Sequence, residues 1–227
     1  MNFPFTPTFI QVLGKIKDAA ARANNKLKLL PTNKQRAISK AAKEVWQNKH
    51  GKQFPIDVFQ TGSGTSTNMN ANEVIANLAS KYSKLDINPN DDVNMSQSSN
   101  DVIPTAMHCA YYVDTAEKLM PAMDLLIDTI AKKIAQYHGV VKTGRTHLMD
   151  AMPLTIDQEL GAWNTQLLNA RASLITVLDA LRFLPQGGTA VGTGINAHPR
   201  FAREFCKAIS PLVGFKAETS NDYFRNL

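Results

Sequence analysis

The stretch "SSNDVIPTAMHCAYYVDTAEKLMPAMDLLIDTIAKKIAQYH", residues 98–138, has the longest helical pattern in the chain. Its apolar residues recur every three or four positions over almost the whole stretch, which predicts one helix from about Asn100 to His138. We expect Pro104 to lie in the first turn of this helix, where its missing N–H costs nothing, and Pro121 to kink the helix. A helix of this length needs other long helices to cover its apolar faces.

The rest of the chain also shows helical spacing of apolar residues. The pattern predicts further helices over residues 8–30, 32–50, 70–82, 154–183 and 198–209. Residues 139–153 are expected to be the connection between the two longest helices. The fold class is therefore predicted to be all-α. Both long helices carry apolar residues on more than one face, which predicts burial against sister subunits in an oligomer.

Composition argues against several classes of protein. Of the 227 residues, 44% are hydrophobic and 19% are charged, so disorder is not expected, and the apolar stretches are too short to cross a membrane. The net charge is +6, which favours the approach of a small dianion. Nucleic-acid binding is not expected, because the basic residues alternate with apolar ones as on solvated helix faces. The first of these basic residues are Lys15, Lys17, Arg22, Lys26, Lys28, Lys34, Arg36, Lys40 and Lys43.

The two cysteines, Cys109 and Cys206, lie far apart in segments that are expected to be helical. Neither has the spacing of a CxxC motif or of a Cys/His metal site, so we expect two buried thiols and no bound metal. The N-terminus lacks the features of a signal peptide. These features predict a reducing, cytoplasmic location.

Three small polar residues, Ser98, Ser99 and Asn100, stand directly before the long helix. Free backbone N–H groups and the positive end of the helix dipole favour an anion at such a position. Plain helix capping is the alternative, and it accounts for one residue of the three. The segment "TGSGTSTNMNANE", residues 61–73, offers more hydroxyls and amides. It lacks the lysine of a phosphate-binding loop, and a turn that caps the next helix is the alternative there.

The segment "KTGRTHLMDAMP", residues 142–153, contains the best candidate for acid/base chemistry, His147. Arg145 beside it can bind a carboxylate, although a lone histidine can also be purely structural. In "GGTAVGTGINAHP", residues 187–199, the pattern from Gly192 to Ala197 imitates a dinucleotide fingerprint. It follows a helix rather than a strand, so no nicotinamide cofactor is expected.

Four segments together resemble the fumarase/aspartase superfamily, and most closely its class II fumarate hydratases. They are "TGSGTSTNMNANEVIANLAS" (61–80), "NMSQSSNDVIPTAMH" (94–108), "KTGRTHLMDAMPLT" (142–155) and "GGTAVGTGINAHPRFA" (187–202), in the family's order. The resemblance implies a bundle of long helices in a homotetramer, with sites built from three subunits. It also implies a partial N-terminal helical domain over residues 1–97 and a partial central bundle over residues 98–227.

The resemblance further implies the reversible hydration of fumarate to L-malate, with no metal or organic cofactor. The resemblance implies that Ser63, Gly64 and Thr65 contact the substrate and that Ser98, Ser99 and Asn100 bind a carboxylate. It also implies that Thr146 and His147 come from a neighbouring subunit and that His147 acts as an acid/base group. The family has a second anion site at a "HPND" stretch. Here that stretch is Asn88, Pro89, Asn90 and Asp91, and the loss of the histidine predicts weak binding or none.

The family's "GSSxMPxKxNP" loop, with the catalytic serine, has no counterpart up to Leu227. We therefore expect a fragment whose isolated chain lacks the base that forms the carbanion. The alternative is a non-catalytic truncated homologue that oligomerises or binds dicarboxylates. An aspartase-like substrate is a third hypothesis, which is less favoured because aspartases tend to carry glutamine where this chain has His147.

Overall fold

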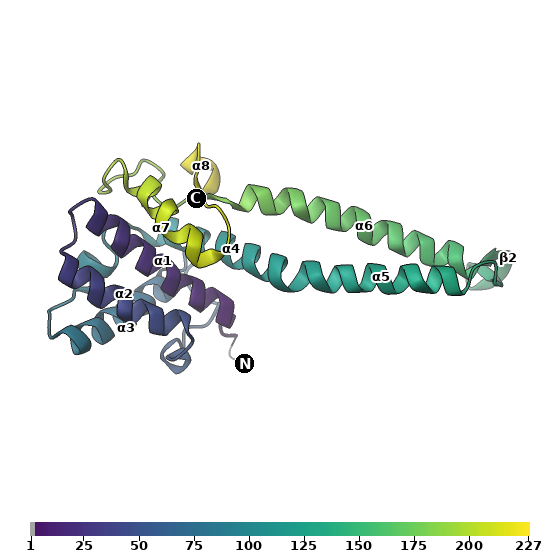
Figure 1. Ribbon diagram of the computed structural model, residues 1–227, viewed down its shortest axis with the longest axis horizontal. Helices are drawn as coiled ribbons and strands as arrows, with labels where there is room; N and C mark the ends of the chain where they lie inside the picture. Colours follow the sequence, from purple (N-terminus) through teal and green to yellow (C-terminus); the bar gives the residue numbers. More distant parts are fainter. Residues whose placement is uncertain (1–2) are drawn as a thin grey trace. The chain divides into compact units, whose positions relative to one another are not determined.

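The computed structural model describes residues 3–227. Helix α1 (Pro7–Lys26) packs against several other helices. It begins where Thr6 accepts the N–H of Phe9 at 3.3 Å, and a proline fills its first position. Its neighbours are α2 (Thr32–Trp46) and α7 (Phe201–Val213), and α2 packs in turn on α3 (Thr65–Ser83) (Figure 1).

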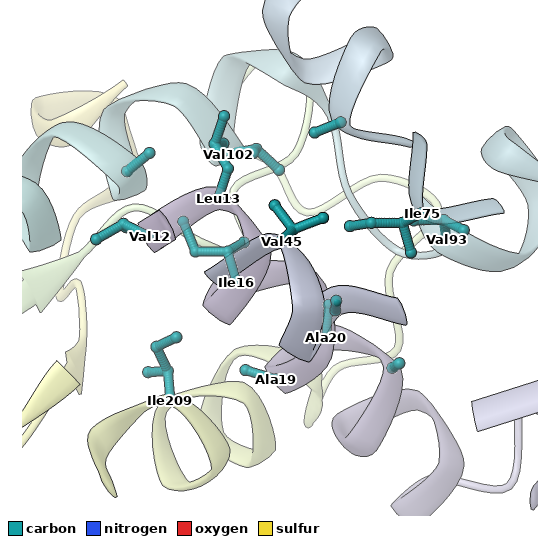
Figure 2. Close-up of a cluster of buried hydrophobic side chains, with 14 of the residues drawn as sticks. Val12, Leu13, Ile16, Ala19, Ala20, Val45, Ile75, Val93, Val102 and Ile209 are labelled. Carbon is teal, nitrogen blue, oxygen red and sulfur yellow. The ribbon is translucent and has the colours of Figure 1, made fainter. Parts of the chain in front are cut away.

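The hydrophobic core lies where these helices meet. Figure 2 shows apolar side chains from several of them converging on one cluster. The exposed fraction of each labelled side chain is at most 1% for Val12, Leu13, Ile16, Ala19, Ala20, Val45, Ile75, Val93, Val102 and Ile209. The helical spacing of apolar residues in α1 and α2 therefore marks core faces, as predicted.

The chain divides into two compact units. The first comprises the residues up to Val113 together with Leu181–Leu227, and the second comprises Asp114–Ala180. These units reflect packing, whereas the division into residues 1–97 and 98–227 concerns the family's domains and stays a prediction. Within residues 3–227, no helix is both long and apolar enough to cross a membrane.

The long helix predicted over residues 100–138 is present, with one irregularity. It consists of α4 (Ser99–Asp114), a π-helical turn η3 (Thr115–Leu119) and α5 (Met120–Gln136). The π-helical turn contains Glu117, whose carbonyl would meet the ring of Pro121 in a regular α-helix. The kink expected at Pro121 stays a prediction.

The expectation for Pro104 is wrong, because α4 already begins at Ser99 and the proline lies in its second turn. Since proline has no N–H, the carbonyl of Asn100 has no partner four residues further along the helix.

In the second unit, residues 139–153 connect the two long helices as expected, but they contain strands that we did not predict. Strands β1 (Val141–Thr146) and β2 (Met149–Thr155) form an antiparallel hairpin that leads into α6 (Ile156–Leu181). Helices α5 and α6 run side by side in this unit, where Arg171 donates to the Asp124 carboxylate at 2.5 and 3.2 Å (Figure 1). No residue of α6 is buried.

Short elements complete the first unit. They are the 3₁₀ turn η1 (Gly51–Gln53), the π-helical turn η2 (Pro89–Val93), the parallel strands β3 (Phe183–Leu184) and β4 (Glu218–Thr219), and α8 (Tyr223–Asn226). With 64% of residues in helices, the all-α prediction is confirmed, and the small strands are additions to it.

Candidate functional site

A cavity of about 390 Å³ in the first unit brings together two of the residues singled out in the sequence, Ser63 and Asn100. Its other walls come from α4, from the Gly-rich turn after β3 and from the last residues of the chain: Gly62, Ile103, Pro104, Met107, Ala190, Val191, Phe224 and Leu227. The floor is mainly apolar and a few polar groups converge on it, which is the usual composition of a small-molecule site.

The loop before α3 is held against α4 by Gly64. Its φ angle is +64°, and a Cβ atom added there would lie 2.9 Å from Ile103 Cγ1, so glycine is needed on both counts. Helix α3 then begins at Thr65, earlier than the predicted residue 70. The hydroxyls of Ser63 and Thr65 lie 3.0 Å apart and both residues are exposed.

The three residues at the start of α4 have three different contacts. Ser98 acts as the cap, because its Oγ accepts the N–H of Asn100 at 3.3 Å and its carbonyl accepts from Val102. Ser99 Oγ accepts from Asn68 Nδ2 at 2.9 Å. The side-chain amide of Asn100 donates to the carbonyl of Ala190 at 2.6 Å. Plain capping thus explains Ser98 but neither of the other two side chains.

Asp101, which follows this cluster, was missed in the sequence. Its buried carboxylate accepts the N–H groups of Ser98 at 2.9 Å and of Gly187 and Thr189 at 3.0 Å each. It therefore ties the Gly-rich turn to α4 beside Asn100. Burial raises the pKa of the Asp101 carboxyl, while the three N–H groups and the Lys17 ammonium oppose this rise.

Lys17 corrects the interpretation of the basic residues as solvated. Its exposed fraction is 0%, and Nζ donates to Asn68 Oδ1 at 2.8 Å, Asn94 Oδ1 at 2.9 Å and Gln97 Oε1 at 3.0 Å. Burial lowers the pKa of Lys17 to about 7, and the Asp101 carboxylate opposes this shift. The sequence did contain a signal for the burial of Lys17, because this residue lies on the same face of α1 as Leu13, four residues earlier.

The second unit contains Thr146 and His147, both exposed, at the end of the β1–β2 hairpin. The turn has positive φ at both central residues, +49° for His147 and +60° for Leu148. Asn-Gly is the usual sequence for such a turn, so two residues with full side chains are held there at an energetic cost. Within residues 3–227, the His147 side chain has no hydrogen-bond partner.

Arg145 donates to Asp150 across the hairpin at 3.1 Å. Both side chains are more than 60% exposed, so this pair contributes little to stability and can open to bind another carboxylate.

The stretch from Asn88 to Asp91 forms the start of the η2 turn. Asn88 Oδ1 accepts the N–H groups of Asn90 at 2.8 Å and Asp91 at 2.9 Å. The carboxylate of Asp92 accepts from the Asn88 N–H and pairs with Lys34 at 2.7 Å. The backbone N–H groups of Asn88, Asn90 and Asp91 are thus already used inside the turn.

Cys109 and Cys206 are free, buried thiols, as predicted. Burial raises the pKa of both, that of Cys206 to about 12. In the described part of the chain, residues 3–227, no group of three or more His, Cys, Asp or Glu side chains could hold a metal ion.

Comparison with known proteins identifies a family model, described as lyase, that matches residues 1–227. A class II fumarate hydratase from Xylella fastidiosa is 49% identical over 100% of this chain and 49% of its own length. One from Pseudomonas aeruginosa is 48% identical over 98% of this chain and 50% of its own. The crystal structure of a class II fumarase from Schistosoma mansoni matches with a TM-score of 0.93 at 36% identity, over 99% of this chain and 51% of that one. The chain thus spans about half the length of the curated relatives that it matches.

Proposed function

Because the chain belongs to the lyase family that includes the class II fumarate hydratases, we propose that it forms the dicarboxylate-binding part of such an enzyme. The whole enzyme would add water reversibly to fumarate and yield L-malate. The proposal rests on the cavity of about 390 Å³ that both Ser63 and Asn100 line, beside the start of α4. That volume lies in the range of small-molecule sites and exceeds what a four-carbon acid needs.

The proposed role of the α4 terminus is to hold one carboxylate. The dipole of α4 favours an anion at this end of the helix. The N–H groups of Ser98 and Asn100 already donate to the Asp101 carboxylate and to Ser98 Oγ, so the proposed contacts come from side-chain donors. Asn100 and Ser63 line the cavity. To the same site we assign Ser99, which precedes Asn100, and Gly64 and Thr65, which follow Ser63. The net charge of +6 favours the approach of a dianion.

The proposed role of His147 is acid/base chemistry through a water molecule, with Thr146 beside it. In the direction of hydration, the oxygen of water bonds to one alkene carbon, a base takes the proton from that water, and the neighbouring carbon receives a proton. The support for His147 is its exposed side chain in a turn with two unfavourable positive φ angles, a kind of strain that collects at functional sites. In the family's pattern this histidine serves the site of a neighbouring subunit.

Oligomer formation is a further part of the proposal. In the second unit, α5 and α6 leave a groove of about 790 Å³ that includes Leu126, Ile130, Leu160, Trp163 and Leu167. An apolar surface of this kind is typical of a helix bundle that is completed by other subunits. We expect sedimentation to show that the unmodified chain is an oligomer. Trp163→Glu is expected to dissociate it, and the control Asn169→Glu, on the other side of α6, is expected to leave it intact.

Two finer points follow from the same proposal. Residues 88–91 make at most a weak second anion site, because Asn88 already accepts from the N–H groups of Asn90 and Asp91. A cytoplasmic location is supported by the free thiols of Cys109 and Cys206.

The proposed function is tested by a conversion assay. Fumarate absorbance is followed after L-malate is added to the chain alone, and to the chain mixed with the part of the Xylella fastidiosa relative that it does not match. We expect turnover in the mixture and none from the chain alone. His147→Asn is expected to lower turnover in the mixture more than it lowers binding.

The other outcomes separate the hypotheses. Fumarate binding without turnover in the mixture favours the non-catalytic homologue. Neither binding nor turnover would overturn the proposed function, and turnover by the chain alone would contradict the expected lack of a base.

A further inference from the structure

Lys17 lies on a face of α1 where an apolar residue would pack more easily. Leu13 and Ala20, four residues before and three residues after Lys17 on the same face, are fully buried in the core (Figure 2). Taking an ammonium out of water is unfavourable unless every donor is hydrogen-bonded, and even then an apolar replacement is often at least as stable. General stability therefore does not account for the charge.

The three partners of Lys17 account for all the donors of an ammonium group. Nζ lies 2.8 Å from Asn68 Oδ1, 2.9 Å from Asn94 Oδ1 and 3.0 Å from Gln97 Oε1. An ammonium group donates three hydrogen bonds and accepts none. Each of these amides must therefore turn its oxygen toward Lys17 and its NH₂ group away from it.

For Asn68 this orientation has a consequence at Ser99, which precedes the cavity-lining Asn100. Its NH₂ group, directed away from Lys17, donates to Ser99 Oγ at 2.9 Å. A serine hydroxyl that accepts from an amide keeps its own hydrogen for another acceptor. If the Asn68 amide were reversed, its oxygen would take the Ser99 hydrogen, and the hydroxyl could no longer donate to a substrate.

We propose that Lys17 is a positioning residue of the dicarboxylate site, which fixes the amide of Asn68 and so keeps the Ser99 hydroxyl a hydrogen-bond donor to a carboxylate. This inference rests on the proposed function, because it requires an anion at Ser99. The effect passes through two hydrogen bonds from the core to the site, and Lys17 itself does not touch the substrate.

A double-mutant cycle on fumarate affinity tests this role. The dissociation constant is measured by calorimetry at a pH below the Lys17 pKa of about 7, where Lys17 is an ammonium. The proteins compared are the unmodified 227-residue chain, Lys17→Met, Ser99→Ala and the double variant, with Lys15→Met on the same helix as control. We expect Lys17→Met to weaken binding about ten-fold, the effect of one hydrogen bond to a charged group. In the Ser99→Ala background the same change is expected to have little further effect, because the affected donor is already gone.

Asn68→Asp provides a second route that does not depend on how well Lys17→Met folds. The carboxylate keeps an oxygen toward Lys17 but offers Ser99 an acceptor in place of a donor. We expect its loss of affinity to be about ten-fold larger with Ser99 present than in Ser99→Ala. A merely structural role would give equal losses in both backgrounds, and that result would overturn the positioning role alone. An unmodified chain that binds no fumarate would overturn the proposed function as well.

Discussion

Replacing Asp101 by alanine is expected to lower the free energy of unfolding more than any surface change in this chain. The carboxylate accepts three backbone N–H groups, those of Gly187 and Thr189 in buried bonds and that of Ser98 in a part-buried one. Each buried donor left without a partner costs roughly 1–3 kcal/mol. Relief of the unfavourable burial of the carboxyl offsets part of this, so we expect a net loss of roughly 3–5 kcal/mol.

Asp101→Asn separates the hydrogen bonds from the charge. Its amide oxygen can still accept from Gly187 and Thr189, which share one carboxylate oxygen, while its NH₂ group faces the N–H of Ser98. We therefore expect a smaller loss, roughly 1–2 kcal/mol. The matched control is Asp128→Ala on an exposed part of α5, which is expected to stay within about 0.5 kcal/mol of the unmodified chain.

The assay is urea unfolding, followed together with the hydrogen exchange of the Gly187 and Thr189 amides. We expect both amides to exchange faster in Asp101→Ala, because they lose their acceptor, and to stay protected in Asp101→Asn. If Asp101→Ala were no less stable than Asp128→Ala, or if these two amides remained protected in it, the view that Asp101 anchors the Gly-rich turn would be wrong.

Three further predictions concern single positions. Gly64→Ala is expected to cost about 1–2 kcal/mol of unfolding free energy and to weaken fumarate binding. The reason is that φ of Gly64 is +64° and that the added Cβ would meet Ile103. Unchanged stability and affinity would contradict this. Leu148→Gly is expected to stabilise the hairpin by about 1 kcal/mol, seen as slower hydrogen exchange in β1, since φ is +60° at this exposed leucine; faster exchange would count against it. Lys17 has a pKa of about 7 instead of 10.5, so between these pH values the unfolded chain binds more protons and this residue makes stability rise with pH. Relative to Lys17→Met, the unmodified chain is expected to gain about 1.4 kcal/mol per pH unit in that window, and parallel pH profiles of the two would refute the low pKa.

The helices were predictable because their apolar residues follow a regular period that is visible in the sequence. Leu13 and Ile16 in α1, and Val102 in α4, are buried where that period requires it. The hairpin at residues 141–155 was not predicted, because its turn residues His147 and Leu148 are neither asparagine nor glycine, which usually mark such a turn.

The burial of Lys17 had a local signal in its helical spacing from Leu13, but the partners in the supporting network of the site were not predictable. Lysine is almost never fully buried, so Lys17 was assigned to a solvated face. Its partners Asn68, Asn94 and Gln97 lie 51, 77 and 80 residues further along the chain, and no local pattern announces such contacts. The same holds for Asp101, whose acceptor role depends on a turn that begins 86 residues later at Gly187.

Amide chemical shifts report whether the start of α4 binds a dicarboxylate. Fumarate is titrated into the isotope-labelled chain, with sodium chloride at equal ionic strength as control. We predict saturable shifts for Ser63, Ser99 and Asn100 that chloride does not reproduce and that Asn100→Ala abolishes. Shifts confined to other parts of the chain, or shifts that chloride matches, would contradict the claim.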